Sequence, residues 1–164
     1  MTAEYWIEKL NLSPHPEGGF YRETYRSLDL LPENTIDRFP SDRNIATAIY
    51  FLLPSGKFSA FHRIFSDELW FFHAGTTLLI HSLDRINGLQ THRLGLDLDK
   101  GEQPQITIPA RYWFGAQVEN SNSYALVSCT VAPGFDFLDF EMGKREKLSE
   151  EYPENKELIK KLTY

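Results

Sequence analysis

Apolar and polar residues alternate in short runs along most of this chain, and turn-forming residues separate the runs. Alternation with a period of two is typical of half-buried β-strands. We expect an early strand over residues 20–26. Further strands are expected over residues 45–53, 59–64, 68–74, 77–83, 90–95, 105–108, 125–131 and 135–141. Short strands at this spacing predict an all-β sandwich or barrel.

Both ends of the chain have a different periodicity. Apolar residues recur at helical spacing over residues 3–11, and Thr2 is a suitable N-cap, so we expect a short amphipathic helix there. Residues 151–162 predict a polar helix with Pro153 at its start. Residues 28–44 are polar and interrupted by prolines, which indicates a loop. No repeat or linker divides the chain, so residues 1–164 are expected to form a single domain.

Composition narrows the class of partner. Aromatic residues make up 14% of the chain and the net charge is −6, without a basic cluster. This charge argues against nucleic acid and anionic membranes as partners. No apolar run is long enough to span a membrane, and the N-terminus has no signal sequence, so we expect a cytoplasmic protein. The single cysteine, Cys129, excludes an internal disulfide and has no Lys or Arg nearby to activate it.

The candidate chemistry lies in residues 56–75, which we expect to form a β-hairpin with its turn at Ser66-Asp67. Strand alternation directs His62 and Glu68 to the same side, and antiparallel pairing brings His62 near Glu68 or Trp70. A His and a Glu among aromatic side chains form either a metal half-site or an acid/base pair. An internal ion pair with a purely structural role is the alternative.

The same segment resembles the first motif of the cupin superfamily. Gly56, His62, Glu68 and Gly75 stand at the spacing of that motif, whereas Ile64 stands where the motif has its second histidine. The second cupin motif is weak, because Phe114 falls where its histidine belongs.

A closer resemblance is to the single-domain cupin-5 family. Residues 14–26, 47–53, 66–70 and 129–137 carry it. The resemblance implies a jelly-roll cupin barrel with an internal pocket, here flanked by short N- and C-terminal helices. It also implies a homodimer, but it implies no reaction, because the family has no settled function.

We favour no metal cofactor. A cupin-like metal site would need His62, residue 64, Glu68 and residue 114, and isoleucine and phenylalanine cannot act as ligands. Only His62 and Glu68 remain as ligands if a divalent metal binds, whereas a catalytic metal usually has three protein ligands.

The leading hypothesis is therefore a small-molecule-binding protein that acts, if it is an enzyme, as a metal-free isomerase or epimerase on a sugar or another polar metabolite. In this hypothesis Glu68 orients His62, and His62 moves the proton. This resembles metal-free cupin epimerases and isomerases. A metal-dependent, dioxygenase-like enzyme with non-standard ligands and a non-catalytic binding or structural protein remain the alternatives.

Several residues are expected to line the pocket. Trp70 and Trp113 would exclude water, Tyr50 or Tyr112 would supply the opposite acid, and Gln105 would offer a neutral hydrogen bond. Arg22 is a candidate clamp for an anion. The ligand-binding set is thus Tyr50, Trp70, Gln105, Trp113 and Arg22.

The segment Glu17-Gly18-Gly19 allows two interpretations. It is either a polar rim over the pocket or a turn that leads into an edge strand, and we favour the turn.

Overall fold

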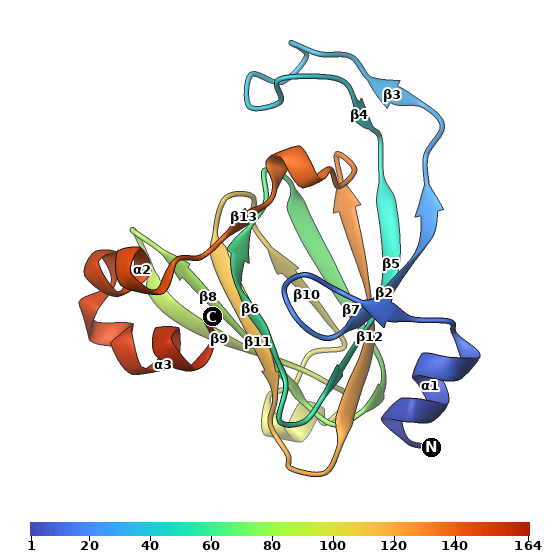
Figure 1. The fold of residues 1–164 in the computed structure, drawn as a ribbon, viewed down its shortest axis with the longest axis vertical. Coiled ribbons are helices and arrows are strands. Elements are labelled where there is room, and N and C mark those ends of the chain that lie inside the picture. Colours follow the sequence, from blue (N-terminus) through green and yellow to red (C-terminus); the bar gives the residue numbers. More distant parts are fainter.

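Two antiparallel β-sheets face each other in the computed structural model, which describes residues 1–164 (Figure 1). The six-stranded sheet has the order β1 (Ser13–Pro14), β2 (Phe20–Arg26), β5 (Thr47–Pro54), β12 (Tyr124–Ala132), β7 (Asp67–Gly75) and β10 (Gln105–Ile108). The five-stranded sheet has the order β13 (Glu141–Met142), β6 (Phe58–Arg63), β11 (Trp113–Val118), β8 (Leu78–Asp84) and β9 (Gly88–Leu94). The predicted all-β jelly roll with flanking helices is confirmed.

Short helices lie outside the two sheets (Figure 1). They are α1 (Ala3–Lys9), α2 (Arg145–Glu151) and α3 (Lys156–Lys161), together with 3-10 turns at Leu98–Lys100, Phe137–Asp139 and Pro153–Asn155. The Thr2 side chain accepts a hydrogen bond from the Tyr5 amide, which confirms the predicted N-cap of α1. No helix is long and apolar enough to cross a membrane.

Most of the predicted strands are present, with one exception. The strand expected over residues 135–141 is wrong, because Asp136 caps the amide of Leu138 and starts a 3-10 turn, so that only β13 remains extended. The C-terminal helix expected over residues 151–162 is present as the 3-10 turn Pro153–Asn155 and α3, with Pro153 at its start, whereas α2 before it was not predicted. Strand β11 was not predicted as an element of its own.

The expected hairpin over residues 56–75 is also wrong, and this correction positions the site. Strand β6 pairs with β11 and β13, whereas β7 pairs with β12 and β10 in the other sheet. The segment between β6 and β7 therefore carries the chain from one sheet to the other. Side-chain alternation is the same for a hairpin and for such a crossover, so the pattern of apolar residues could not distinguish them.

The main core lies between the sheets and includes Phe51, Trp70 and Phe114. A second cluster, which contains Trp113, Ile159 and Leu162, attaches the C-terminal helices to the outer side of the five-stranded sheet. Helix α1 covers Leu52 and Leu126 on the outer side of the six-stranded sheet. Both sheets are thus covered on the outside while the space between them remains available for a cavity.

The chain between β2 and β5 forms an arm that contains β3 (Leu30–Leu31) and β4 (Arg43–Asn44) and extends beyond the sandwich (Figure 1). Arg43 at the base of the arm forms a buried ion pair with Asp139, with Nη2–Oδ1 and Nε–Oδ2 distances of 2.7 Å. Arg38 donates from Nε to the Phe65 carbonyl at 2.6 Å. These contacts attach the arm to the segment that follows β12 and to the crossover between β6 and β7.

Candidate functional site

A cavity of about 620 Å³ lies between the two sheets. Its volume is in the range of small-molecule sites in proteins, and most of its walls are apolar or aromatic. The lining side chains come from both sheets, from the segment that precedes β2 and from the turn after β12: Ser13, His15, Glu17, Tyr21, Arg22, Glu23, Arg26, Thr47, Ile49, Phe51, His62, Ile64, Glu68, Trp70, Cys129, Val131, Phe135, Asp136 and Phe137.

Glu17 lines the cavity, whereas the sequence analysis favoured a turn over a polar rim for its segment. It precedes two glycines that adopt positive φ angles, 110° at Gly18 and 73° at Gly19. A side chain at Gly18 would collide with the carbonyl of Phe58 on β6, so only glycine allows the segment to lie against that strand. The Ala60 amide then donates to the Glu17 carbonyl at 2.7 Å. This close approach places the Glu17 side chain, which is 5% exposed, inside the sandwich.

His62 is 2% exposed and pairs with Glu17, with His62 Nε2 3.0 Å from Glu17 Oε2. The other ring nitrogen, Nδ1, lies 2.7 Å from the Ala60 carbonyl oxygen. A carbonyl oxygen can only accept, so Nδ1 carries a hydrogen. A single further proton must then lie between Nε2 and Glu17. Glu17 and His62 are therefore one acid/base unit with one shared proton.

Burial decides where this proton lies. It lowers the pKa of His62 to about 4, against the opposing effect of the hydrogen bond to Ala60. Burial likewise raises the pKa of Glu17, although His15 and the Ser59 hydroxyl stabilise its carboxylate. Both shifts favour the neutral forms, so the Glu17 carboxylic acid donates to the His62 imidazole.

Two further contacts fix the Glu17 carboxyl. The Ser59 hydroxyl donates to Glu17 Oε1 at 2.8 Å. His15 Nδ1 lies 3.5 Å from Glu17 Oε2 and accepts the Glu17 amide at 3.3 Å. Burial lowers the pKa of His15, which keeps this ring neutral as well. The carboxyl therefore lies between two histidines and a serine.

Glu68 enters the cavity from the opposite sheet and is 7% exposed. No Lys, Arg or His nitrogen lies within 4.0 Å of its carboxyl. Burial raises the pKa of Glu68 to about 8, and the Glu17 carboxyl adds to this shift whenever it is ionised. Glu68 is thus a protonated acid at neutral pH. The expected His62–Glu68 pair is wrong, because Glu17 and not Glu68 contacts His62.

Burial also raises the pKa of the Cys129 thiol, and the neighbouring Glu68 adds to the shift. Cys129 is therefore a buried, neutral wall of the cavity.

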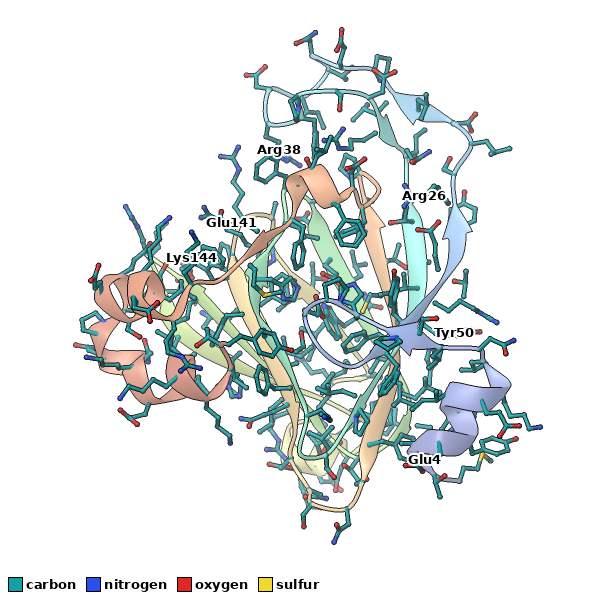
Figure 2. All side chains as sticks on the ribbon, in the orientation of Figure 1. Glu4, Arg26, Arg38, Tyr50, Glu141 and Lys144 are labelled. Carbon is teal, nitrogen blue, oxygen red and sulfur yellow. The ribbon has the colours of Figure 1, made fainter.

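The other predicted ligand-binding residues divide into two groups. Trp70 and Arg22 line the cavity. Tyr50 packs beside α1 on the outside of the six-stranded sheet (Figure 2), and Trp113 packs in the cluster under the C-terminal helices. Gln105 is exposed on β10. In each case the next residue of the strand faces the inner core instead: Phe51 after Tyr50, Ile106 after Gln105 and Phe114 after Trp113.

Tyr112, the other candidate acid, also lies outside the lining, and its hydroxyl accepts from the Asn87 side chain at 3.4 Å.

The donor set does not match a metal centre of the cupin type. Ile64 lines the cavity, the Phe114 ring packs on the His62 ring with 4.1 Å between centroids, and both nitrogens of His62 are engaged within the protein. No group of three or more His, Cys, Asp or Glu side chains is arranged to hold a metal ion. A catalytic metal usually needs three such ligands, which these residues do not provide.

Comparison with known proteins identifies the family. The family model described as "Cupin superfamily (DUF985)" matches residues 4–143. The chain belongs to this cupin-5 family. As a member, it is 40% identical to a protein of known structure from Shewanella oneidensis, with a TM-score of 0.90 over 100% of this chain and 98% of that one. It is 36% identical to a hypothetical protein from Leishmania major, with a TM-score of 0.91 over 100% and 99% of the two chains.

More distant cupins share the fold alone. Oxalate decarboxylase from Bacillus subtilis is 13% identical, with a TM-score of 0.56 over 91% of this chain and 36% of that one. The chain is therefore a cupin-fold protein, and the comparisons with its relatives establish no specific activity.

Proposed function

We propose that this cupin binds a small polar metabolite in the cavity between its sheets and transfers a proton on it without a metal, as an isomerase or epimerase. One observation carries the proposal. The cavity holds a Glu17–His62 unit on one side and the protonated Glu68 on the other, and no cation neutralises Glu68. A base and an acid that enter one cavity from opposite sheets suit proton transfer next to a carbonyl group.

The proposed step starts from the neutral pair. Glu17 takes the proton from the carbon next to the substrate carbonyl and passes its own proton to His62 Nε2. The electron pair of the broken C–H bond forms the C=C bond of an enediol, while Glu68 gives its proton to the carbonyl oxygen. His62 is then cationic and Glu68 anionic, so the total charge is unchanged. Return of the protons at the neighbouring carbon, or on the other face of the same carbon, completes isomerisation or epimerisation.

This assignment changes the roles that the sequence suggested. Both nitrogens of His62 are hydrogen-bonded inside the protein, so Glu17 is the group that meets the substrate. His62 supports it by accepting a proton and by holding the resulting charge. Glu68 acts as the acid instead of orienting His62.

Solvent deuterium exchange tests the proposal. The protein is incubated in D2O with dihydroxyacetone, fructose and 2-hydroxyacetophenone, and incorporation next to the carbonyl is followed by NMR. We expect catalysed exchange with at least one of these compounds and its loss in Glu17→Gln and in His62→Ala. His73→Ala is the matched control, because His73 is an exposed histidine that hydrogen-bonds to Ser128 outside the cavity. Exchange that persists in the Glu17 variant, or its absence with all three compounds, contradicts the proposed reaction.

A binding protein without a reaction is the second candidate. The aromatic walls and the volume of the cavity favour ligand binding regardless of chemistry. Saturable binding of a cavity ligand without exchange would favour this candidate. Cytoplasmic location and a homodimer remain predictions.

A further inference from the structure

Trp70 supplies a hydrogen-bond donor that the protein does not use. Its side chain is 1% exposed and lines the cavity, and its indole Nε1 has no hydrogen-bond partner. Buried indole N–H groups usually find a partner, because an unsatisfied donor costs about 1–3 kcal/mol. An acceptor oxygen that arrives with a ligand would satisfy this donor.

Glu68 lies two residues before Trp70 on β7, so strand alternation places both side chains on the same side of the sheet. Glu68 has no basic partner within 4.0 Å, and an isolated buried carboxylate is strongly disfavoured. It therefore offers an O–H group to the cavity. The groups that face it are Glu17 and His62 across the cavity and Cys129 on the neighbouring strand β12, and none of them is a free cation.

We call the part of the cavity around Trp70, Glu68 and the Glu17–His62 unit its buried end. This end has no charge available for an ionic ligand. Glu17 shares its proton with His62, so it offers no free carboxylate to an amine. The arginines Arg22 and Arg26 lie on β2, away from β7. Arg26 is at the base of the arm (Figure 2) and already donates from Nε and Nη2 to Glu23 at 2.9 and 2.7 Å. An anionic group at the buried end would find no cation.

Aromatic side chains complete the cavity. Phe51 packs edge-on against Trp70 with 5.8 Å between ring centroids, and Phe135 and Phe137 close the wall after β12. Such walls favour an apolar or planar body next to the polar group of the ligand.

From these contacts we infer that the ligand is uncharged at its buried end and carries there a carbonyl or hydroxyl oxygen that accepts hydrogen bonds from Trp70 and Glu68. The inference deepens the proposed function, since it names the class of substrate that the same cavity selects. Uncharged hydroxy-ketones and keto-sugars belong to this class. Carboxylates, phosphate esters and amines do not bind with their charged group at this end.

Three probes of similar size test the inference. 2-Hydroxyacetophenone is uncharged, mandelate is anionic and 2-phenylethylamine is cationic, and all three carry one phenyl ring. Binding to the full chain is measured by isothermal titration calorimetry at pH 6.5. This pH is below the pKa of Glu68, which is about 8, so Glu68 is protonated. We expect the uncharged probe to bind at millimolar concentration or below, and to bind at least tenfold more tightly than either charged probe.

Variants then identify the donors. Trp70→Phe removes the N–H but keeps a ring, and we expect it to weaken binding of 2-hydroxyacetophenone about 5- to 10-fold. Trp113→Phe is the matched control, because Trp113 is a similarly buried tryptophan outside the cavity. This variant should bind 2-hydroxyacetophenone with the affinity of the wild type. Glu68→Gln keeps an N–H donor and should retain binding, whereas Glu68→Leu should lose it.

The outcomes separate this inference from the proposed reaction. Tighter binding of mandelate or of 2-phenylethylamine, no binding of the uncharged probe, or unchanged affinity in Trp70→Phe overturns the inference. Binding of the uncharged probe through Trp70 without deuterium exchange supports the inference and contradicts the reaction. Deuterium exchange with an uncharged compound, combined with unchanged affinity in Trp70→Phe, would support the reaction and overturn the inference.

Discussion

Glu17 and His62 form a hydrogen-bonded pair inside the sandwich, with 3.0 Å between Oε2 and Nε2. Glu17 reaches this position from a segment outside the main strands, and His62 comes from the centre of β6. Because the Ala60 carbonyl already holds the other ring nitrogen, the pair can contain only one shared proton. The chemistry that we propose depends on this limit.

Loss of the Glu17 carboxyl should destabilise the protein. Glu17→Ala leaves His62 Nε2 and the Ser59 hydroxyl without their partner in a buried place, so we expect the free energy of unfolding to fall by about 1–3 kcal/mol. Glu17→Gln should cost less, because the amide can donate to His62 and accept from Ser59. Urea denaturation measures both variants, with the exposed Glu8→Ala as the control. A Glu17→Ala variant as stable as the wild type would show that the pair is not formed.

Glu68 should make stability depend on pH. Its pKa is about 8 in the folded protein and near 4.5 as a free group, so the folded state holds a proton that the unfolded chain releases. The protonated Glu68 therefore stabilises the folded state fully below about pH 4.5. This stabilisation is lost as the pH rises to about 8, and the free energy of unfolding falls by up to about 1.4 kcal/mol per pH unit. His62 acts in the opposite direction, but only between its folded pKa of about 4 and its ordinary value of 6.5.

The comparison therefore concentrates on the range from pH 6.5 to 8. The free energy of unfolding of the wild type should fall with pH there, and Glu68→Gln should reduce this slope because glutamine does not titrate. Denaturant unfolding at several pH values provides the measurement. Equal slopes for the two proteins would contradict the assignment of a protonated Glu68.

Gly18 should tolerate no side chain. Its φ angle is 110°, and a Cβ atom would collide with the Phe58 carbonyl, so Gly18→Ala is expected to cost more than about 1 kcal/mol and to displace Glu17. Gly56→Ala is the matched control, since Gly56 also has a positive φ of 78° but has open space around its Cβ position. The variants are compared by thermal unfolding and by the NMR signals of the His62 ring. Similar losses in both would mean that the close approach to β6 is unimportant.

Removal of one partner of the buried Arg43–Asp139 ion pair should strongly destabilise the protein. Asp139→Ala leaves the guanidinium buried without its partner, and we expect a loss of about 3–5 kcal/mol. The double variant Arg43→Met with Asp139→Leu should recover much of this loss, because it removes both charges. The single variants Arg43→Met and Asp139→Leu, the double variant and the wild type form a double-mutant cycle, in which urea denaturation gives the coupling energy. Additive losses in the two single variants would argue against a direct interaction.

Much of the fold follows from local patterns, and the site depends on contacts that are distant in the sequence. Strand β10 has the predicted bounds, and both His62 and Glu68 lie inside the sandwich as alternation requires. Glu17 was assigned to a turn, because nothing near it in the sequence indicates that two glycines bring it against β6. The ion pair of Asp139 is equally distant, because its partner Arg43 lies 96 residues away in the sequence. Period-two alternation gives the direction of a side chain, but it does not give the sheet to which a strand belongs.

The crossover between β6 and β7 has a mechanical consequence. The Glu17–His62 unit is attached to the five-stranded sheet, and Glu68 belongs to the six-stranded sheet. A short segment joins β6 to β7, and core residues such as Phe114 and Trp70, which pack between the sheets, help to set the distance between the two groups. Small changes in the volume of these core residues would alter the distance that a proton must travel, although the residues themselves exchange no proton.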